Sequence, residues 1–86
     1  ESHVRTQIDS QLGRFAARLT RVEAHISDEN AHKSGPTDKR CTLEARPAGM
    51  NPIAVESRAA DFYAAVTEAA GKLSRALNTR FERHTA

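Results

Sequence analysis

The first nineteen residues place an apolar side chain at every third or fourth position. These residues are Val4, Ile8, Leu12, Phe15 and Leu19. At 100° per residue they fall within roughly 80° of arc around a helix axis, which is typical of an amphipathic helix. The spacing therefore predicts a helix from Val4 to Leu19, with Ser2 as its N-cap.

After Leu19 the apolar positions alternate with polar ones, which is typical of half-buried strands. Three such segments follow one another, near 21–28, 39–46 and 53–58. Their inward residues are expected to be Val22, Ala24, Ile26, Cys41, Leu43, Ala45, Ile53 and Val55. A polar segment from Asp28 to Asp38 with Gly35-Pro36 predicts a loop, and residues 47–52 predict a turn. Both connections are too short for a parallel crossover with a helix, so they favour antiparallel hairpins.

The C-terminal third shows the helical spacing again. Its apolar stripe consists of Phe62, Val66, Ala69, Leu73 and Leu77, and it predicts a helix from Ala59 to about Arg83. The expected fold is therefore an α+β domain, α-β-β-β-α, that spans residues 1–86. Because each element has one apolar face, both helices should cover the same side of the sheet and leave the other side open to water.

Composition and charge narrow the function classes without deciding among them. The chain is 38% hydrophobic and 28% charged with a net charge of +2, as in ordinary soluble globular proteins. Cys41 is the single cysteine, which fits a reducing, cytoplasmic location. We expect neither a membrane span nor a signal peptide. The first residue is Glu1 rather than methionine, so the chain is interpreted as a possible fragment.

The open face of the predicted sheet carries four arginines against three glutamates. Its polar residues are Arg21, Glu23, His25, Ser27, Arg40, Thr42, Glu44, Arg46, Glu56 and Arg58. One interpretation is cross-strand ion pairing on a solvated face. The other is a surface that lies against RNA phosphate or a partner protein. The face has no aromatic residue, so a base-stacking platform is not expected.

The helices supply the other candidate binding residues. The predicted RNA-binding side chains are Lys72, Arg75, Arg80, Arg83, Arg14 and Arg18. In the last helix the acids come early and the bases late, which also complements the helix dipole. The charges of Arg14 and Arg18 also fit a purely solubilising role. Both interpretations stay open for these six residues.

Residues that would indicate an enzyme or a metal centre are missing from the pattern. The four histidines, His3, His25, His32 and His84, have no metal-ligand spacing with Cys41. Cys41 lies on the predicted inward face, where a thiol is a core residue rather than a nucleophile. No phosphate-binding glycine loop is present. We therefore expect no catalytic residue, no metal and no cofactor.

Four segments resemble sequences of one known protein family. Residues 61–66 (DFYAAV) and 72–77 (KLSRAL) are similar to its closing helix. Residues 19–30 (LTRVEAHISDEN) and 38–49 (DKRCTLEARPAG) are similar to a short-form branch. The family that these segments resemble is the ribosome hibernation promoting factor family, also called the RaiA-like or sigma-54 modulation protein family. Within the motif, Lys72 and Arg75 match the basic positions, and Tyr63 matches an aromatic position that is expected to be structural.

The resemblance implies binding to the small ribosomal subunit, in the channel used by messenger and transfer RNA, and inhibition of translation under stress or in stationary phase. It also implies a β-α-β-β-β-α fold whose first strand is missing from this chain. The exposed edge of the strand near 21–28 would then permit a homodimer.

Two other interpretations stay open. The order α-β-β-β-α and Gly35-Pro36 also fit a double-stranded RNA-binding domain, although the second helix lacks that domain's lysine cluster. A protein-interaction module without an RNA role fits the balanced charge of the sheet face. Neither alternative predicts binding to ribosomes through Lys72 and Arg75.

Overall fold

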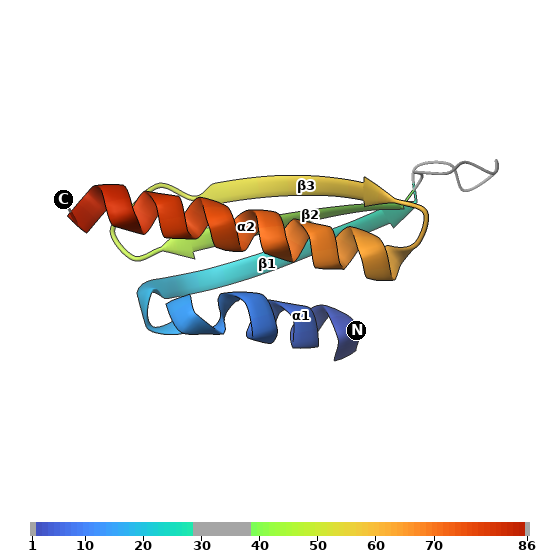
Figure 1. Ribbon diagram of the computed structural model, residues 1–86, viewed down its shortest axis with the longest axis horizontal. Coiled ribbons are helices and arrows are strands. Elements are labelled where there is room, and N and C mark those ends of the chain that lie inside the picture. The colour runs from blue at the N-terminus through green and yellow to red at the C-terminus, as the bar shows by residue number, and fades with distance from the viewer. Residues whose placement is uncertain (1, 29–38, 86) are drawn as a thin grey trace.

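Two helical segments enclose one side of a three-stranded sheet in the computed structural model of the chain (Figure 1). The structure describes residues 2–28 and 39–85. The elements are α1 (Ser2–Leu12), the 3₁₀ helix η1 (Gly13–Arg18), β1 (Leu19–Asp28), β2 (Lys39–Pro47), β3 (Ile53–Ala59) and α2 (Phe62–Thr85). The predicted order α-β-β-β-α is confirmed, and the predicted loop at 29–38 lies outside the described residues.

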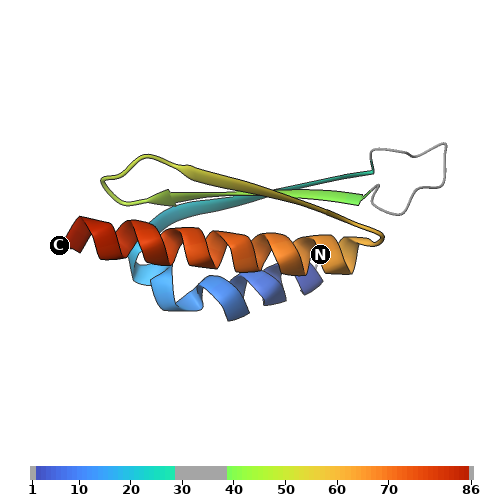
Figure 2. The same cartoon turned by 45° about the horizontal axis from the view of Figure 1, so that its top comes forward.

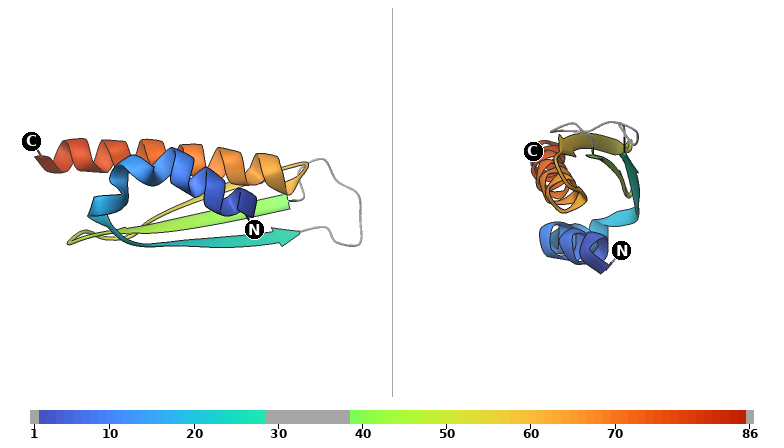
Figure 3. Two further views of the ribbon diagram at one scale, coloured as in Figure 1. Left: turned by 90° about the horizontal axis from the view of Figure 1, so that it is seen from below. Right: turned by 90° about the vertical axis from the view of Figure 1, so that its right-hand side faces the viewer.

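The sheet has the strand order β1-β2-β3, and both pairs are antiparallel as predicted. Ala24 opposes Leu43, and Leu43 opposes Val55, so the apolar residues of the three strands share one face. Both helices lie on that face, and no described element covers the other face (Figure 2). The end-on view in Figure 3 shows the sheet curving around α2, with α1 below it.

The first helix is shorter than its periodicity predicts. The α-helix ends at Leu12, and the chain continues as η1 to Arg18. The change comes at Gly13, whose low helix propensity makes it a weak point in an α-helix. The tighter 3₁₀ turn repeats every three residues and keeps Leu12 and Phe15 both buried. Leu19, predicted as the last helical residue, is instead the first residue of β1.

The start of α2 also differs from the prediction, because β3 extends to Ala59 and the helix begins at Phe62. Asp61 supplies the cap: its Oδ1 accepts a hydrogen bond from the backbone N–H of Ala64 at 2.8 Å. Aspartate is a favoured N-cap because its carboxylate satisfies an otherwise unpaired N–H group. The turn between β2 and β3 is as predicted, with Gly49 at φ 76°, a conformation that favours glycine.

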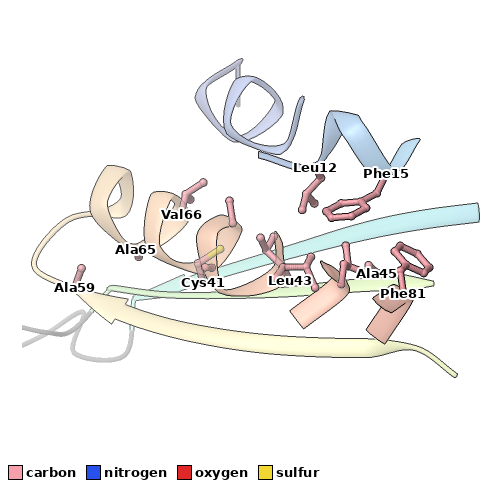
Figure 4. Packing of buried hydrophobic residues seen from close by; sticks show 13 residues of the cluster. Leu12, Phe15, Cys41, Leu43, Ala45, Ala59, Ala65, Val66 and Phe81 are labelled. Atoms are coloured by element: carbon pink, nitrogen blue, oxygen red, sulfur yellow. The ribbon is translucent and has the colours of Figure 1, made fainter. Parts of the chain in front are cut away.

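The core forms between α2 and the sheet (Figure 4). Cys41, Leu43 and Ala45 of β2 are fully buried beneath Leu73 and Leu77 of α2, which confirms the predicted faces of both elements. Desolvation by burial raises the pKa of the Cys41 thiol. Cys41 is therefore a small core residue, as expected, and its environment disfavours the thiolate.

Phe81 closes the core at the end of α2 and was not among the predicted core residues. Its ring lies 5.5 Å from that of Phe15, centroid to centroid, and both side chains are buried. Phe81 follows Leu77 by four residues and thus continues the apolar stripe. The contact joins η1 to the last turns of α2 and fixes how the two helical segments lie against each other.

Candidate functional site

The open face of the sheet is a network of short ion pairs. Three of them join residues two apart along a single strand, Arg21–Glu23 at 2.7 Å, Arg46–Glu44 at 3.9 Å and Arg58–Glu56 at 3.2 Å. One crosses strands, Arg40–Glu56 at 4.0 Å, and His25 lies 3.6 Å from Glu23. Each arginine of this face thus has a neighbouring carboxylate, and Arg40 and Arg58 share Glu56.

The strand register explains why most of these pairs run along strands rather than across them. Arg21 lies opposite Arg46, and Glu23 lies opposite Glu44. Like charges directly opposite each other are unfavourable, so each arginine turns to the carboxylate on its own strand. The prediction of ion pairing on this face is correct, but Arg21 and Arg46 pair along their own strands rather than across strands.

The six predicted binding residues all lie on the helical layer, and they have a different kind of partner. Within residues 2–28 and 39–85, none of them forms an ion pair with a carboxylate. Five of the six are exposed, and Arg80 is half-buried. The structure divides them into three groups rather than one cluster.

The first group lies along the side of α2 that faces β3. The Lys72 ammonium donates a hydrogen bond to the backbone carbonyl of Glu56 at 2.8 Å. The Arg80 guanidinium donates to the backbone carbonyl of Asn51 at 3.0 Å. These bonds tie α2 to β3 and to the β2–β3 turn, so both cations have a structural contact while keeping their full charge.

The second group, Arg75 and Arg83, is exposed on α2. The Arg75 side chain lies back along the helix toward Gly71. A Cβ atom placed on Gly71 would be 3.4 Å from its Nη1. Lys72, which precedes it on the helix, is also exposed. The side chains of Lys72 and Arg75 are therefore both accessible, as the sequence predicts.

The third group brings Arg14 and Arg18 of η1 against α2. The Arg14 guanidinium donates to Ser74 Oγ at 3.3 Å and lies 4.6 Å from the centroid of the Phe15 ring. The Arg18 guanidinium lies 3.7 Å from the centroid of the Phe81 ring. Sequence spacing could not show this pairing, because the two residues meet α2 about sixty positions away in the chain.

An aromatic cluster that the sequence did not reveal lies where α1 and α2 begin. The His3 and Tyr63 rings stack with centroids 3.9 Å apart, and Tyr63 is 64% exposed. Phe62 and Ile26 are the other large exposed hydrophobic residues of the described chain, and both line the same cleft. Tyr63 is thus a surface residue held by His3, and not a side chain flanking the core.

Two absences hold for the part of the chain that the structure describes, residues 2–28 and 39–85. No group of three or more histidine, cysteine or acidic side chains is placed to hold a metal ion there. No described helix is long and apolar enough to cross a membrane.

Comparison with protein families decides the assignment. Residues 1–85 match the family described as sigma 54 modulation protein / S30EA ribosomal protein. The chain belongs to this family. The resemblance found in the closing-helix motif is thereby confirmed over nearly the whole chain. A comparison with curated proteins returned no match.

Proteins of this family are ribosome-associated modulation proteins. The family is not known for enzymatic activity. The basic residues of the helical layer thus belong to a domain whose family associates with ribosomes.

Proposed function

We propose that this domain binds the small ribosomal subunit in the channel for messenger and transfer RNA, and that it inhibits translation as a hibernation factor under stress. One observation carries the proposal most directly. The six basic residues of the helical layer lack a carboxylate partner among the described residues, whereas the arginines of the sheet face have one. In a ribosome-associated family, the helical layer is therefore the surface suited to ribosomal RNA.

The physical basis is the release of counterions from RNA. Each lysine or arginine that meets a phosphate displaces a condensed cation, which favours binding and makes it depend on salt. Lys72 and Arg75 are the residues best placed by sequence motif and exposure. Arg14, Arg18, Arg80 and Arg83 extend the same layer.

Inhibition needs no catalytic group in this proposal. A folded domain that occupies the channel excludes transfer RNA by its volume alone. The working compartment is accordingly the cytoplasm, where ribosomes translate. Contacts to ribosomal proteins supplement the modest net charge of +2.

The test is co-sedimentation of the purified protein with isolated small and large subunits, followed by competition with transfer RNA. We expect binding to the small subunit and displacement by transfer RNA. A protein that stays in the supernatant at low salt would contradict the proposal and favour an interaction module. Tight binding to plain duplex RNA with little binding to subunits would favour the double-stranded RNA interpretation.

The homodimer through the edge of β1 stays a prediction. β1 is the outer strand of the described sheet and pairs on one side with β2. Sedimentation equilibrium at rising protein concentration distinguishes a dimer from a monomer. A monomer at all concentrations would remove the dimer without affecting ribosome binding.

A further inference from the structure

A shallow groove of about 310 Å³ runs between η1 and the last turns of α2. Its walls are Arg14, Phe15, Arg18, Asn78, Phe81 and Glu82. The two arginines are the cationic groups of the groove, and both are exposed. The groove is thus a local concentration of positive charge on the helical layer.

The guanidinium groups of this groove are held in place before any ligand arrives. Arg18 stacks on the Phe81 ring at 3.7 Å, and Phe81 is itself fixed against Phe15 in the core. Arg14 is held by the hydroxyl of Ser74 and by the Phe15 ring. Stacking occupies the faces of the guanidinium planes and leaves most of their N–H donors available at the edges.

The other charged group of the groove is Glu82. Its carboxylate accepts a hydrogen bond from the Asn78 amide at 3.2 Å. One carboxylate against two guanidinium groups leaves an excess of positive charge. An anionic ligand is therefore favoured over a cationic or neutral one.

We propose that this groove binds a backbone phosphate of RNA through Arg14 and Arg18. The proposal rests on the proposed ribosome-binding function and deepens it, because it singles out one anion site within the helical layer. A guanidinium fork matches two phosphate oxygens at once, which a lysine cannot do. Lys72 and Arg80 differ because neither lines the groove, and each donates to a backbone carbonyl of β3 or of the β2–β3 turn instead.

The test compares three double variants in binding to isolated small subunits over a range of salt concentrations. Arg14→Gln with Arg18→Gln should weaken binding and flatten the log–log salt dependence by roughly 0.7–0.9 for each lost phosphate contact. Arg14→Lys with Arg18→Lys should keep the salt slope but bind more weakly, because the fork is lost. Arg21→Gln with Arg46→Gln removes the same charge from the sheet face and should leave binding unchanged.

Two further measurements separate a change in groove charge from a loss of folding. Glu82→Gln should raise affinity, since it removes the opposing carboxylate from the groove. Thermal unfolding of each variant identifies loss of folding, and the lysine pair retains an alkyl stem over the Phe81 ring. A glutamine pair that keeps wild-type affinity and slope would overturn the proposal. A glutamine pair that binds more weakly with an unchanged slope would assign the groove to a ribosomal protein, and would equally overturn it.

The phosphate site can be tested separately from ribosome binding. If the wild-type protein does not bind subunits at all, titration with a short single-stranded oligouridylate still tests the groove by NMR. The Nε–H resonances of Arg14 and Arg18 should then shift upon RNA addition. Unshifted resonances would rule out the phosphate site as well.

Discussion

The open sheet face and the helical layer both carry several basic residues, but the two surfaces hold them differently. On the sheet, Arg21, Arg46 and Arg58 each have a carboxylate two residues away on the same strand. On the helices, Arg14 and Arg18 lie against aromatic rings, and Lys72 contacts a backbone carbonyl. A carboxylate neutralises a cation, whereas a ring or a carbonyl positions it without cancelling its charge.

The net charge of a chain therefore does not show which of its surfaces binds a polyanion. The net charge of +2 looks weak for an RNA-binding protein. Within residues 2–28 and 39–85, the six predicted binding residues of the helical layer nevertheless lack a carboxylate partner, whereas the arginines of the sheet face have one. Which residues are paired decides the local potential, and the pairing depends on the strand register.

The largest expected effect tests whether the buried side of α2 holds the helical layer in place. Leu73 is fully buried between α2 and the sheet. Leu73→Ala should lower the free energy of unfolding by about 2–5 kcal/mol, because it removes apolar contacts and leaves a cavity. Urea denaturation followed by circular dichroism measures this loss.

Thr79→Ala is the matched control, since Thr79 is exposed on the same helix. It should change the free energy of unfolding by no more than about 0.5 kcal/mol. Equal effects of the two substitutions would contradict the division of α2 into a buried side and a free side.

A smaller effect is expected at Gly71, on the part of α2 over which Arg75 lies. Among the described residues, an added Cβ would meet the flexible end of Arg75, at 3.4 Å. Gly71→Ala should therefore raise the free energy of unfolding by about 0.5–1 kcal/mol through higher helix propensity. Urea denaturation checks the sign, and a destabilised variant would mean that the helix needs the glycine for packing.

The smallest change in stability is expected when the carboxylates of the sheet face are removed, so that its arginines lack partners like the cations of the helical layer. Glu23→Gln with Glu44→Gln removes the carboxylates that balance Arg21 and Arg46. Because exposed ion pairs contribute only about 0–1 kcal/mol, the free energy of unfolding should change little. Binding to a single-stranded oligouridylate should increase and become more salt-dependent, as filter binding would show. Unaltered binding would mean that ion pairing is not what keeps this face from RNA.

The sequence alone predicts the order of elements and most of the core, since periodicity reports which residues share a face. Leu43, Leu73 and Leu77 are buried as predicted. The switch to a 3₁₀ helix at Gly13 was missed, because an apolar spacing of three or four fits either helix.

The sequence predicts which residues belong to the candidate site, but not how their side chains are arranged. Arg14 and Arg18 were selected by charge, whereas their rings and the Ser74 hydroxyl come from tertiary contacts between distant segments. The partner of Lys72 is likewise a carbonyl of β3, which no local pattern indicates. Side-chain partners across elements follow from packing and register, and those emerge only in the folded chain.

We propose that exposed cations of the helical layer, rather than those of the sheet face, meet ribosomal RNA. The most direct measurement is the salt dependence of small-subunit binding for Lys72→Gln with Arg75→Gln against Arg21→Gln with Arg46→Gln. Each pair removes the same charge. The helical pair should weaken binding and flatten the log–log slope by roughly 0.7–0.9 per lost contact, while the sheet pair leaves both unchanged. An unchanged slope for the helical pair, or equal losses for the two pairs, would contradict the account.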